Sequence, residues 1–269
     1  WPRHFPGQRS FPICHRRPDP KRRRLFDCLA YLSDSEMTLA PLTLNGEHVQ
    51  LTPEGGVFLP ACRTLIVADL HFEKGSAMAA RGRRLAPPYD TTATLDRLQR
   101  LVRRMRPGRV VALGDSFHDG AGPLRLGDAE ARRIQALTKA VEWVWIAGNH
   151  DPDPPAALGG TAASELLAGS LLLRHEPRSG PRPGEVAGHL HPKAAVATSA
   201  RRVSGFCFVT DGQRIILPAF GAYTGGLDVH TPVIRDLFKR GLKVFLLGQE
   251  RLYQFPMSKL SKPRRAASL

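Results

Sequence analysis

The chain has 269 residues, 42% of them hydrophobic, which is enough apolar content for the core of one compact domain. No apolar run approaches the roughly 20 residues that span a bilayer, so we expect a soluble, cytoplasmic protein without a membrane partner. The formal net charge of +15 favours phosphate-bearing partners, nucleic acid first, although an Arg-rich solvated surface explains it equally well. The four cysteines form no Cys-x-x-Cys pair, and we interpret them as reduced thiols.

The two ends of the chain differ in composition from the middle. Residues 1–36 are rich in Pro and Arg and show no sustained periodicity, so we expect a disordered or non-native extension before Met37. This segment has no apolar stretch of the kind found in secretory signals. Residues 257–269 are basic, with no acidic residue, and are expected to form a disordered tail. The sequence therefore predicts a single domain over residues 37–256.

Within that domain, buried strands alternate with helices and then predominate. A helix is expected to begin at Asp90 or Thr91 and to end before Pro107, and two more are expected at 128–140 and 232–240. The segments 72–85 and 152–163 have the composition of loops. This order predicts an α/β fold with more than one sheet. Strands are expected at 42–44, 49–51, 57–59, 64–68, 109–113, 143–147, 171–173, 186–187, 206–209, 215–217, 243–247 and 251–255.

Polar residues follow several of these strands directly. Asp69-Leu70-His71, Gly114-Asp115 and Gly148-Asn149-His150-Asp151 come after the strands at 64–68, 109–113 and 143–147, and His175 and Gly188-His189-Leu190-His191 come after later ones. Chemistry in α/β sheets gathers at the carboxyl ends of the strands, so we expect these side chains to meet. Each block alone is a weak signal. Together and in this order they predict a metal centre.

Carboxylate, imidazole and amide ligands in this mixture suit Mn, Fe, Zn or Ni. Seven ligands are too many for one tetrahedral ion and fit two ions that share a carboxylate. Two ions about 3.5–4 Å apart clamp a phosphoryl group and acidify a bridging water, which supplies hydroxide at neutral pH. His150 is then free to act as an acid or to stabilise charge on the leaving oxygen. His118 and Asp119 fit either an orienting role or a turn. The expected ligands are Asp69, His71, Asp115, Asn149, His175, His189 and His191.

These motifs, in this order, resemble the signature of the calcineurin-like metallophosphoesterases. The resemblance implies a four-layer α/β/β/α sandwich with two divalent metal ions. It implies that Asp115 bridges the ions and that His150 is the catalytic imidazole, with Asp151 beside it. It assigns Asp69, His71 and His191 to one ion. It assigns Asn149, His175 and His189 to the other.

A narrower resemblance covers roughly residues 42–255. The stretches 68–75, 79–82, 87–91, 113–119, 188–192 and 217–226 are similar to those of bacterial ligase-associated DNA damage response endonucleases of the PdeM type. This implies a metal-dependent endonuclease or phosphodiesterase that acts on DNA in repair, and it points to DNA ligase or helicase repair proteins as partners. Mixed oxygen and nitrogen ligands together with intracellular supply favour Mn²⁺.

Two other functions remain open at this point. The same centre would serve a small-molecule phosphodiesterase or phosphatase, and a metallophosphoesterase scaffold can also be a non-enzymatic interaction module, which the intact ligand set disfavours. Basic side chains in the 72–85 segment favour DNA. Tyr89 or Tyr223 would favour single strands if it stacked on an unpaired base, although a packing role explains either residue equally well. The expected DNA contacts are Lys74, Arg81, Arg83 and Arg84.

Overall fold

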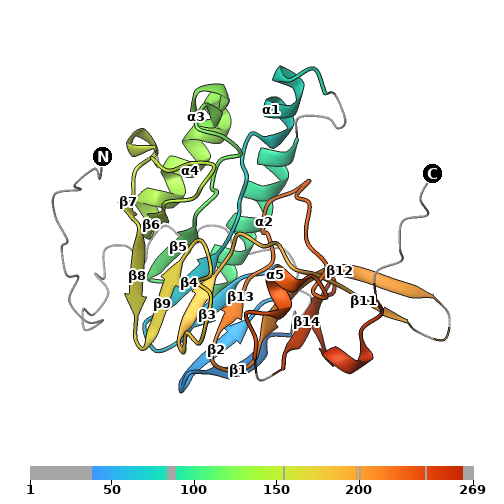
Figure 1. Ribbon diagram of the computed structural model, residues 1–269. Helices are drawn as coiled ribbons and strands as arrows, with labels where there is room; N and C mark the ends of the chain where they lie inside the picture. Colours follow the sequence, from blue (N-terminus) through green and yellow to red (C-terminus); the bar gives the residue numbers. More distant parts are fainter. Residues whose placement is uncertain are drawn as a thin grey trace, which may run out of the picture.

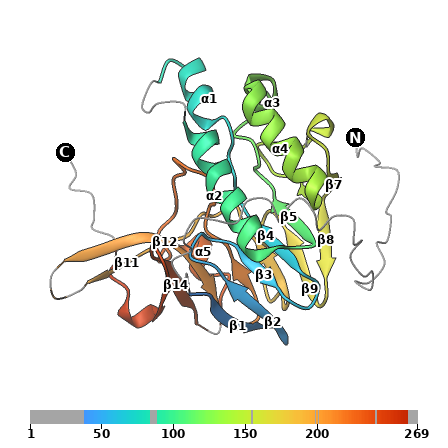
Figure 2. The same ribbon diagram turned by 180° about the vertical axis from the view of Figure 1, so that it is seen from behind.

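The computed structural model describes residues 38–83, 89–153, 155–197, 199, 201–239 and 241–262. Two β-sheets lie face to face, and helices cover the outer face of the first sheet (Figures 1 and 2). Among the described residues, no helix has the length and apolar character needed to cross a membrane. The helices and 3-10 turns are α1 (Lys74–Ala80), α2 (Asp90–Met105), α3 (Gly122–Arg125), α4 (Asp128–Ala140), η3 (Ala156–Leu158), α5 (Pro232–Arg235) and η4 (Met257–Lys259).

The first sheet has seven strands in the spatial order β1-β2-β3-β4-β5-β6-β7. Its first four strands are antiparallel neighbours, whereas β4, β5, β6 and β7 run parallel to one another. The parallel half brings the carboxyl ends of β4, β5 and β6 to one edge, which is where the polar blocks were expected to meet. The strands are β1 (Ala40–Leu44), β2 (Glu47–Leu51), β3 (Val57–Leu59), β4 (Thr64–Val67), β5 (Arg109–Leu113), β6 (Glu142–Ile146) and β7 (Thr161–Ala163).

The second sheet has eight strands in the order β15-β14-β12-β13-β10-β9-β8, with β11 paired to β12. The β11–β12 ribbon projects from the body of the molecule (Figure 1). The strands are β8 (Glu165–Ala168), β9 (Leu171–Arg174), β10 (Glu185–Ala187), β11 (Lys193–Ala197), β12 (Arg202–Thr210), β13 (Ile215–Ile216), β14 (Lys243–Leu247) and β15 (Leu252–Pro256).

Strand alternation divides the apolar side chains among three cores. Ile66 on β4 packs between the two sheets with Phe208 of the second sheet, whereas Leu65 faces α2 and packs with Leu98. A third core lies on the outer face of the second sheet and includes Ile234 of α5. Three cores between successive layers confirm the expected four-layer α/β/β/α sandwich, in which α5 and its flanking chain form a thin fourth layer.

The structure differs from the expected elements in four places. Residues 74–80, expected as loop, form α1, because Gly75 and Ala77 are small enough to pack and the Gly75 N–H donates to buried Asp90 at 3.0 Å. For the same reason neither Asp90 nor Thr91 caps α2; both side chains accept from backbone N–H groups of the α1 region. The strands β7, β8 and β11 and the four-residue helix α3 were missed. The helix expected at 232–240 is only the four-residue α5.

The expected tail at 257–269 is also partly wrong. Met257–Lys259 form η4, and Leu260, 8% exposed, joins the third core and bridges to Val196 of β11. The Ser261 N–H donates to the Ala195 carbonyl at 2.8 Å. One apolar residue within a basic run is enough to attach this segment to the sheet. Residues 263–269 lie outside the described residues, as does the segment expected to be disordered at 1–36.

We propose that the working domain begins at Met37, and a shortened chain tests this. The first described contact is the Thr38 N–H donating to the Glu250 carbonyl at 2.9 Å, and β1 follows at once. A chain that begins at Met37 is expected to melt at the same temperature as the full chain in calorimetry. A chain that begins at Asn45 lacks β1 and should melt lower. A large loss of stability in the first variant would contradict the proposal.

Candidate metal centre

The predicted ligands meet at the edge of the first sheet where the parallel strands end. Asp69 and His71 follow β4, Asp115 follows β5, and Asn149 follows β6. The remaining ligands come from the second sheet: His175 follows β9, and His189 and His191 follow β10. The centre therefore lies where both sheets end, and all seven predicted ligands are described in the structure.

Backbone geometry sets these residues apart from the rest of the fold. Five of the ligands have positive φ angles, namely Asp69 (55°), His71 (43°), Asp115 (46°), His189 (68°) and His191 (45°). A left-handed conformation is uncommon outside glycine and costs on the order of 1 kcal/mol or more at each position. Such conformations gather at functional sites, because the surrounding packing holds a side chain in a direction that relaxed backbone would not give.

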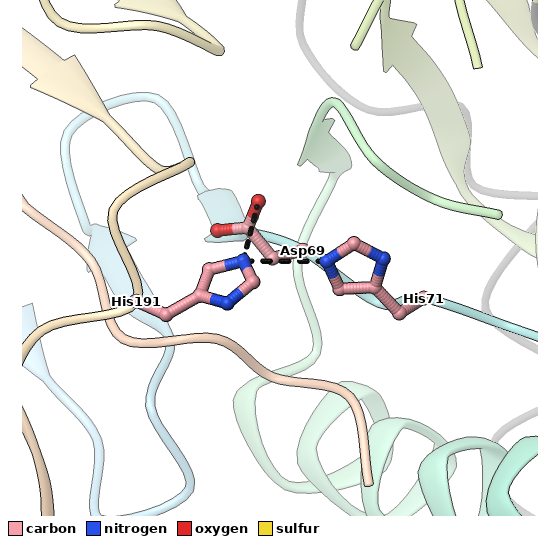
Figure 3. A group of neighbouring side chains, drawn as sticks. All are labelled: Asp69, His71 and His191. Atoms are coloured by element: carbon pink, nitrogen blue, oxygen red, sulfur yellow. Dashed lines mark hydrogen bonds and ion pairs between the residues drawn. The ribbon is translucent and has the colours of Figure 1, made fainter. Parts of the chain in front are cut away.

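The first ligand group consists of Asp69, His71 and His191, whose side chains point toward one another (Figure 3). The Nε2 atoms of His71 and His191 lie 3.3 Å apart, and Asp69 Oδ1 lies 3.3 Å from His191 Nε2. The His189 backbone N–H donates to both Asp69 oxygens, at 3.2 and 3.0 Å, and so fixes the carboxylate. Three ligating atoms that face one point form an arrangement that suits a cation.

The second group consists of Asp115, His175 and His189, with Asn149 beside them. His175 Nε2 lies 2.9 Å from Asn149 Oδ1 and 3.2 Å from His189 Nδ1. His175 Nδ1 donates to the Leu113 carbonyl at 2.8 Å, which orients the ring and directs Nε2 toward the centre. This is the arrangement that the sequence predicted for a second ion.

Asp115 lies between the two groups. Its Oδ2 is 3.9 Å from His71 Nε2 in the first group, and its Oδ1 is 3.4 Å from His175 Nε2 in the second. The carboxylate is 2% exposed and accepts the His150 backbone N–H at 2.9 Å. One carboxylate thus faces both groups, as a bridging ligand must.

The buried carboxylates and imidazoles of the site shift one another's pKa values. Burial, reinforced by the charge of His191, lowers the pKa of His71 to about 2, so this imidazole is neutral and offers a lone pair. Burial opposes ionisation of Asp115, but the hydrogen bond and charge of His175 outweigh it and hold the pKa of Asp115 at about 2. Burial also opposes charge on His175, yet Asp115 and Asp69 raise its pKa to about 9. The two carboxylates therefore draw positive charge into the centre, and the donor set fits divalent ions.

Two glycines allow the loops that carry the candidate ligands to pack closely against one another. A Cβ on Gly148 would lie 2.2 Å from the Asp115 nitrogen and 2.3 Å from its Oδ1. A Cβ on Gly114 would lie 2.5 Å from the His175 ring, and Gly114 has a φ of 69°. The glycines that precede Asp115 and Asn149 are thus required for the packing of the centre.

His150 lies beside the first group without joining it. Its side chain is 43% exposed, and its Nε2 is 3.9 Å from Asp115 Oδ2. The His150 ring stacks on His118, with centroids 5.4 Å apart, and both rings meet His71 edge to face. His118 therefore supports the position of His150. The imidazole of His150 itself remains accessible to a substrate.

Asp151, expected to act beside His150, is placed behind the centre. It is 3% exposed, and its Oδ2 accepts the Phe117 backbone N–H at 3.0 Å. Burial raises its pKa to about 7. Its contact stabilises the turn that carries Asp115, so the structure supports a positioning role for this carboxylate.

The expected DNA contacts are spread along α1. Burial lowers the pKa of both His71 and His118, and the charge of Lys74, the first residue of α1, adds to this effect. Arg81, with a 65% exposed side chain, is 3.8 Å from Asp119 at the far end of the helix, and Arg83 is exposed beyond it. Arg84 lies outside the described residues.

Sequence reasoning missed a group of charged residues beside the second ligand group. An open pocket of about 520 Å³ adjoins Asn149 and His175, and its lining includes Glu165, Arg174 and Arg178. No motif spacing marks these residues, because they come from different strands and loops. The only local sign is that Arg174 directly precedes the ligand His175.

Two groups of metal-ligating side chains that share one buried carboxylate define a two-metal phosphoesterase centre. The sequence model of the family described as "Calcineurin-like phosphoesterase" matches residues 62–215. The chain belongs to this family, and the predicted superfamily resemblance is confirmed. It is accordingly a metal-dependent hydrolase of phosphoesters. A comparison with curated protein sequences finds no match.

Among solved structures, the chain is similar to the crystal structure of Pseudomonas putida nuclease MPE, with a TM-score of 0.63 and 30% identity over 81% of this chain and 100% of that one. It is also similar to YfcE, a phosphoesterase from E. coli, with a TM-score of 0.36 and 15% identity over 72% of this chain and 98% of that one.

Proposed function

We propose that this protein is a two-metal phosphodiesterase that cleaves DNA, with single strands preferred, and that it acts in cytoplasmic DNA repair. The observation that carries the proposal is the position of Asp115 between two complete ligand groups. The choice of DNA is supported by the basic side chains along α1 and by the similarity to a nuclease at 30% identity over that protein's whole length. Association with DNA ligase or helicase repair proteins is part of the proposal and rests on the narrower sequence resemblance.

The ligand groups fit two divalent ions, which when bound polarise phosphoryl oxygens and acidify a water. We propose Mn²⁺, because mixed carboxylate, amide and imidazole ligands suit it; Fe, Zn and Ni fit the same ligands. The chain's own contribution is positioning. His189 holds Asp69 through its backbone N–H, and Leu113 holds His175 through its carbonyl.

His150 is the group that moves a proton in this proposal. Its ring is partly exposed, supported by His118, and close to the first ligand group. An imidazolium in this place donates a proton to the oxygen that leaves phosphorus, which makes that oxygen a better leaving group. Lys74 at the start of α1, whose charge acts on His71 and His118, adds positive charge for the substrate phosphate.

Substituting the exposed arginines of the α1 region tests the choice of DNA. In an Arg81→Ala/Arg83→Ala variant we expect cleavage of single-stranded DNA to weaken and its salt dependence to flatten, because each phosphate contact to a single strand adds about −0.7 to the log–log slope. The measurement is kcat/KM on a labelled oligonucleotide across a salt series. Hydrolysis of bis(p-nitrophenyl) phosphate should change far less, since that ester is too short to reach the far end of α1.

A matched control removes the same charge from the opposite edge of the sheet. Arg103 and Lys139 lie in the last turns of α2 and α4, next to the amino ends of β5 and β6. An Arg103→Ala/Lys139→Ala variant should keep the wild-type salt slope. Equal losses on DNA and on the small ester in the α1 variant would show that these arginines support the fold, and the small-phosphoester alternative would then be preferred.

A further inference from the structure

The pocket of about 520 Å³ beside Asn149 and His175 has no role in the mechanism above, yet its size is that of a ligand site. It is built where the turn after the carboxyl end of β6 meets the β8–β9 pair, so both sheets contribute. Apart from the two metal ligands, its lining consists of Ala147, Gly148, Ser164, Glu165, Arg174, Glu176, Pro177 and Arg178.

A buried ion-pair network makes the floor of this pocket rigid. Arg174 is 5% exposed and pairs with Glu165 at the pocket and with Glu185 behind it. Glu185 also pairs with Arg214 at 2.8 Å, and its Oε1 accepts the Arg178 backbone N–H at 3.1 Å. The loop that carries Arg178 is therefore attached to the floor through its main chain.

The polar groups that remain open are of opposite charge. The guanidinium of Arg178 and the carboxylate of Glu176 are both exposed in the lining of the pocket, and the charge of Glu176 also acts on His189. Apart from the metal ligands, the lining thus holds two carboxylates and two guanidinium groups, whose charges balance. A balanced set of charges does not favour a phosphate. A neutral group with donors, acceptors and a flat apolar face fits this lining, and a nucleoside is such a group.

The position of the pocket indicates which nucleoside it would hold. His150 lies against His71 at the first ligand group, whereas the pocket opens beside Asn149 and His175 at the second. The alcohol that takes a proton from His150 leaves at the His150 end. The other substituent on phosphorus extends toward the pocket.

We propose that this pocket binds the nucleoside that keeps the phosphate when the ester is cleaved. The inference rests on the proposed function. In the reaction, the oxygen of water bonds to phosphorus, the P–O bond to the departing nucleotide breaks, and that oxygen leaves as an alcohol with a proton. The retained nucleoside is released as a phosphate monoester, with its sugar and base in contact with Arg178 and Glu176.

Esters that share one leaving group test this directly. The p-nitrophenyl esters of the 5′- and 3′-monophosphates of the four deoxynucleosides and bis(p-nitrophenyl) phosphate all release p-nitrophenolate, so they differ only in the retained group. With Mn²⁺-loaded enzyme, at least one nucleotide ester should exceed the bis ester in kcat/KM by about tenfold, the effect of one hydrogen bond to a charged group.

The Arg178→Ala variant should lower this preference by about tenfold, and calorimetry should show a similar weakening for the nucleoside monophosphate product. Arg182→Ala is the matched control, because Arg182 is an exposed arginine of the same loop outside the pocket lining. It should keep both the preference and the binding, and both variants should melt at the wild-type temperature.

The outcomes separate this inference from the function on which it rests. If the enzyme cleaves single-stranded DNA and the bis ester but shows no preference for any nucleotide ester, the pocket assignment is overturned and the phosphodiesterase stands. The same holds if Arg178→Ala leaves the preference and the product binding intact. If neither DNA nor any diester is hydrolysed, the proposed function and the inference both fail.

Discussion

Replacing Asp115 with Asn is expected to cause the largest loss of activity of any single substitution in this protein. The carboxylate faces His71 on one side and His175 on the other, so both ligand groups lose a charged donor at once. An amide is neutral and offers only one oxygen. Bound metal ions supply several kcal/mol of transition-state stabilisation, and each 1.36 kcal/mol is tenfold in rate, so we expect a loss of about 10³-fold or more.

The measurement for Asp115→Asn is kcat/KM on bis(p-nitrophenyl) phosphate, together with the number of metal ions retained per chain by elemental analysis. Asp153→Asn is a suitable control, because Asp153 is an exposed carboxylate two residues after Asp151. It should keep both metal content and rate. Wild-type turnover in Asp115→Asn with two bound ions would show that Asp115 does not bridge the centre.

The second large effect is expected for His150→Ala, which should keep both metal ions and lose about 10²–10⁴ in rate, the usual range for a positioned acid or base. His150 belongs to neither ligand group, and its ring rests on His118 beside the first of them. The loss should depend on the leaving group. Nitrophenolate departs without a proton, whereas the sugar oxygen of DNA needs one, so DNA cleavage should suffer more.

The metal content of the variant and its rates on the two substrates together decide the role of His150. Loss of a metal ion from His150→Ala would make this residue a ligand and contradict the assignment. Equal losses on DNA and on the nitrophenyl ester would mean that His150 stabilises charge without donating a proton. His230→Ala is the matched control, because that imidazole is bound to Asp228 at 2.7 Å and should be silent in both assays.

The meeting of the candidate metal ligands was predictable because each one comes shortly after a predicted strand. Runs such as 64–68 and 109–113 are buried on both faces, and their apolar continuity ends abruptly in Asp69 and Asp115. Once these strands are known to be parallel neighbours, their carboxyl ends must lie at one edge. The order of the four layers came from the family resemblance, whereas the pattern of elements predicted only an α/β fold with more than one sheet.

The helix α1 could not be predicted from local pattern. Its residues, which include Gly75 and several alanines, lack the apolar stripe of a surface helix, and its stability comes from packing and from hydrogen bonds to Asp90 and Thr91. A similar cause explains why residues 257–262 are structured: Leu260 packs in a core formed by the second sheet. In both segments tertiary contacts outweigh composition.

The sequence by itself determined which side chains are the candidate metal ligands and in which order the strands deliver them, because residue identity and strand periodicity are local properties. Only the tertiary structure decided how those ligands are held and what surrounds them. The left-handed backbone of Asp69 and Asp115, the buried position of Asp151, and the pocket at Arg178 all depend on contacts between segments distant in the chain. Such contacts produce no periodic pattern in the sequence, since each segment contributes only one or two residues to them.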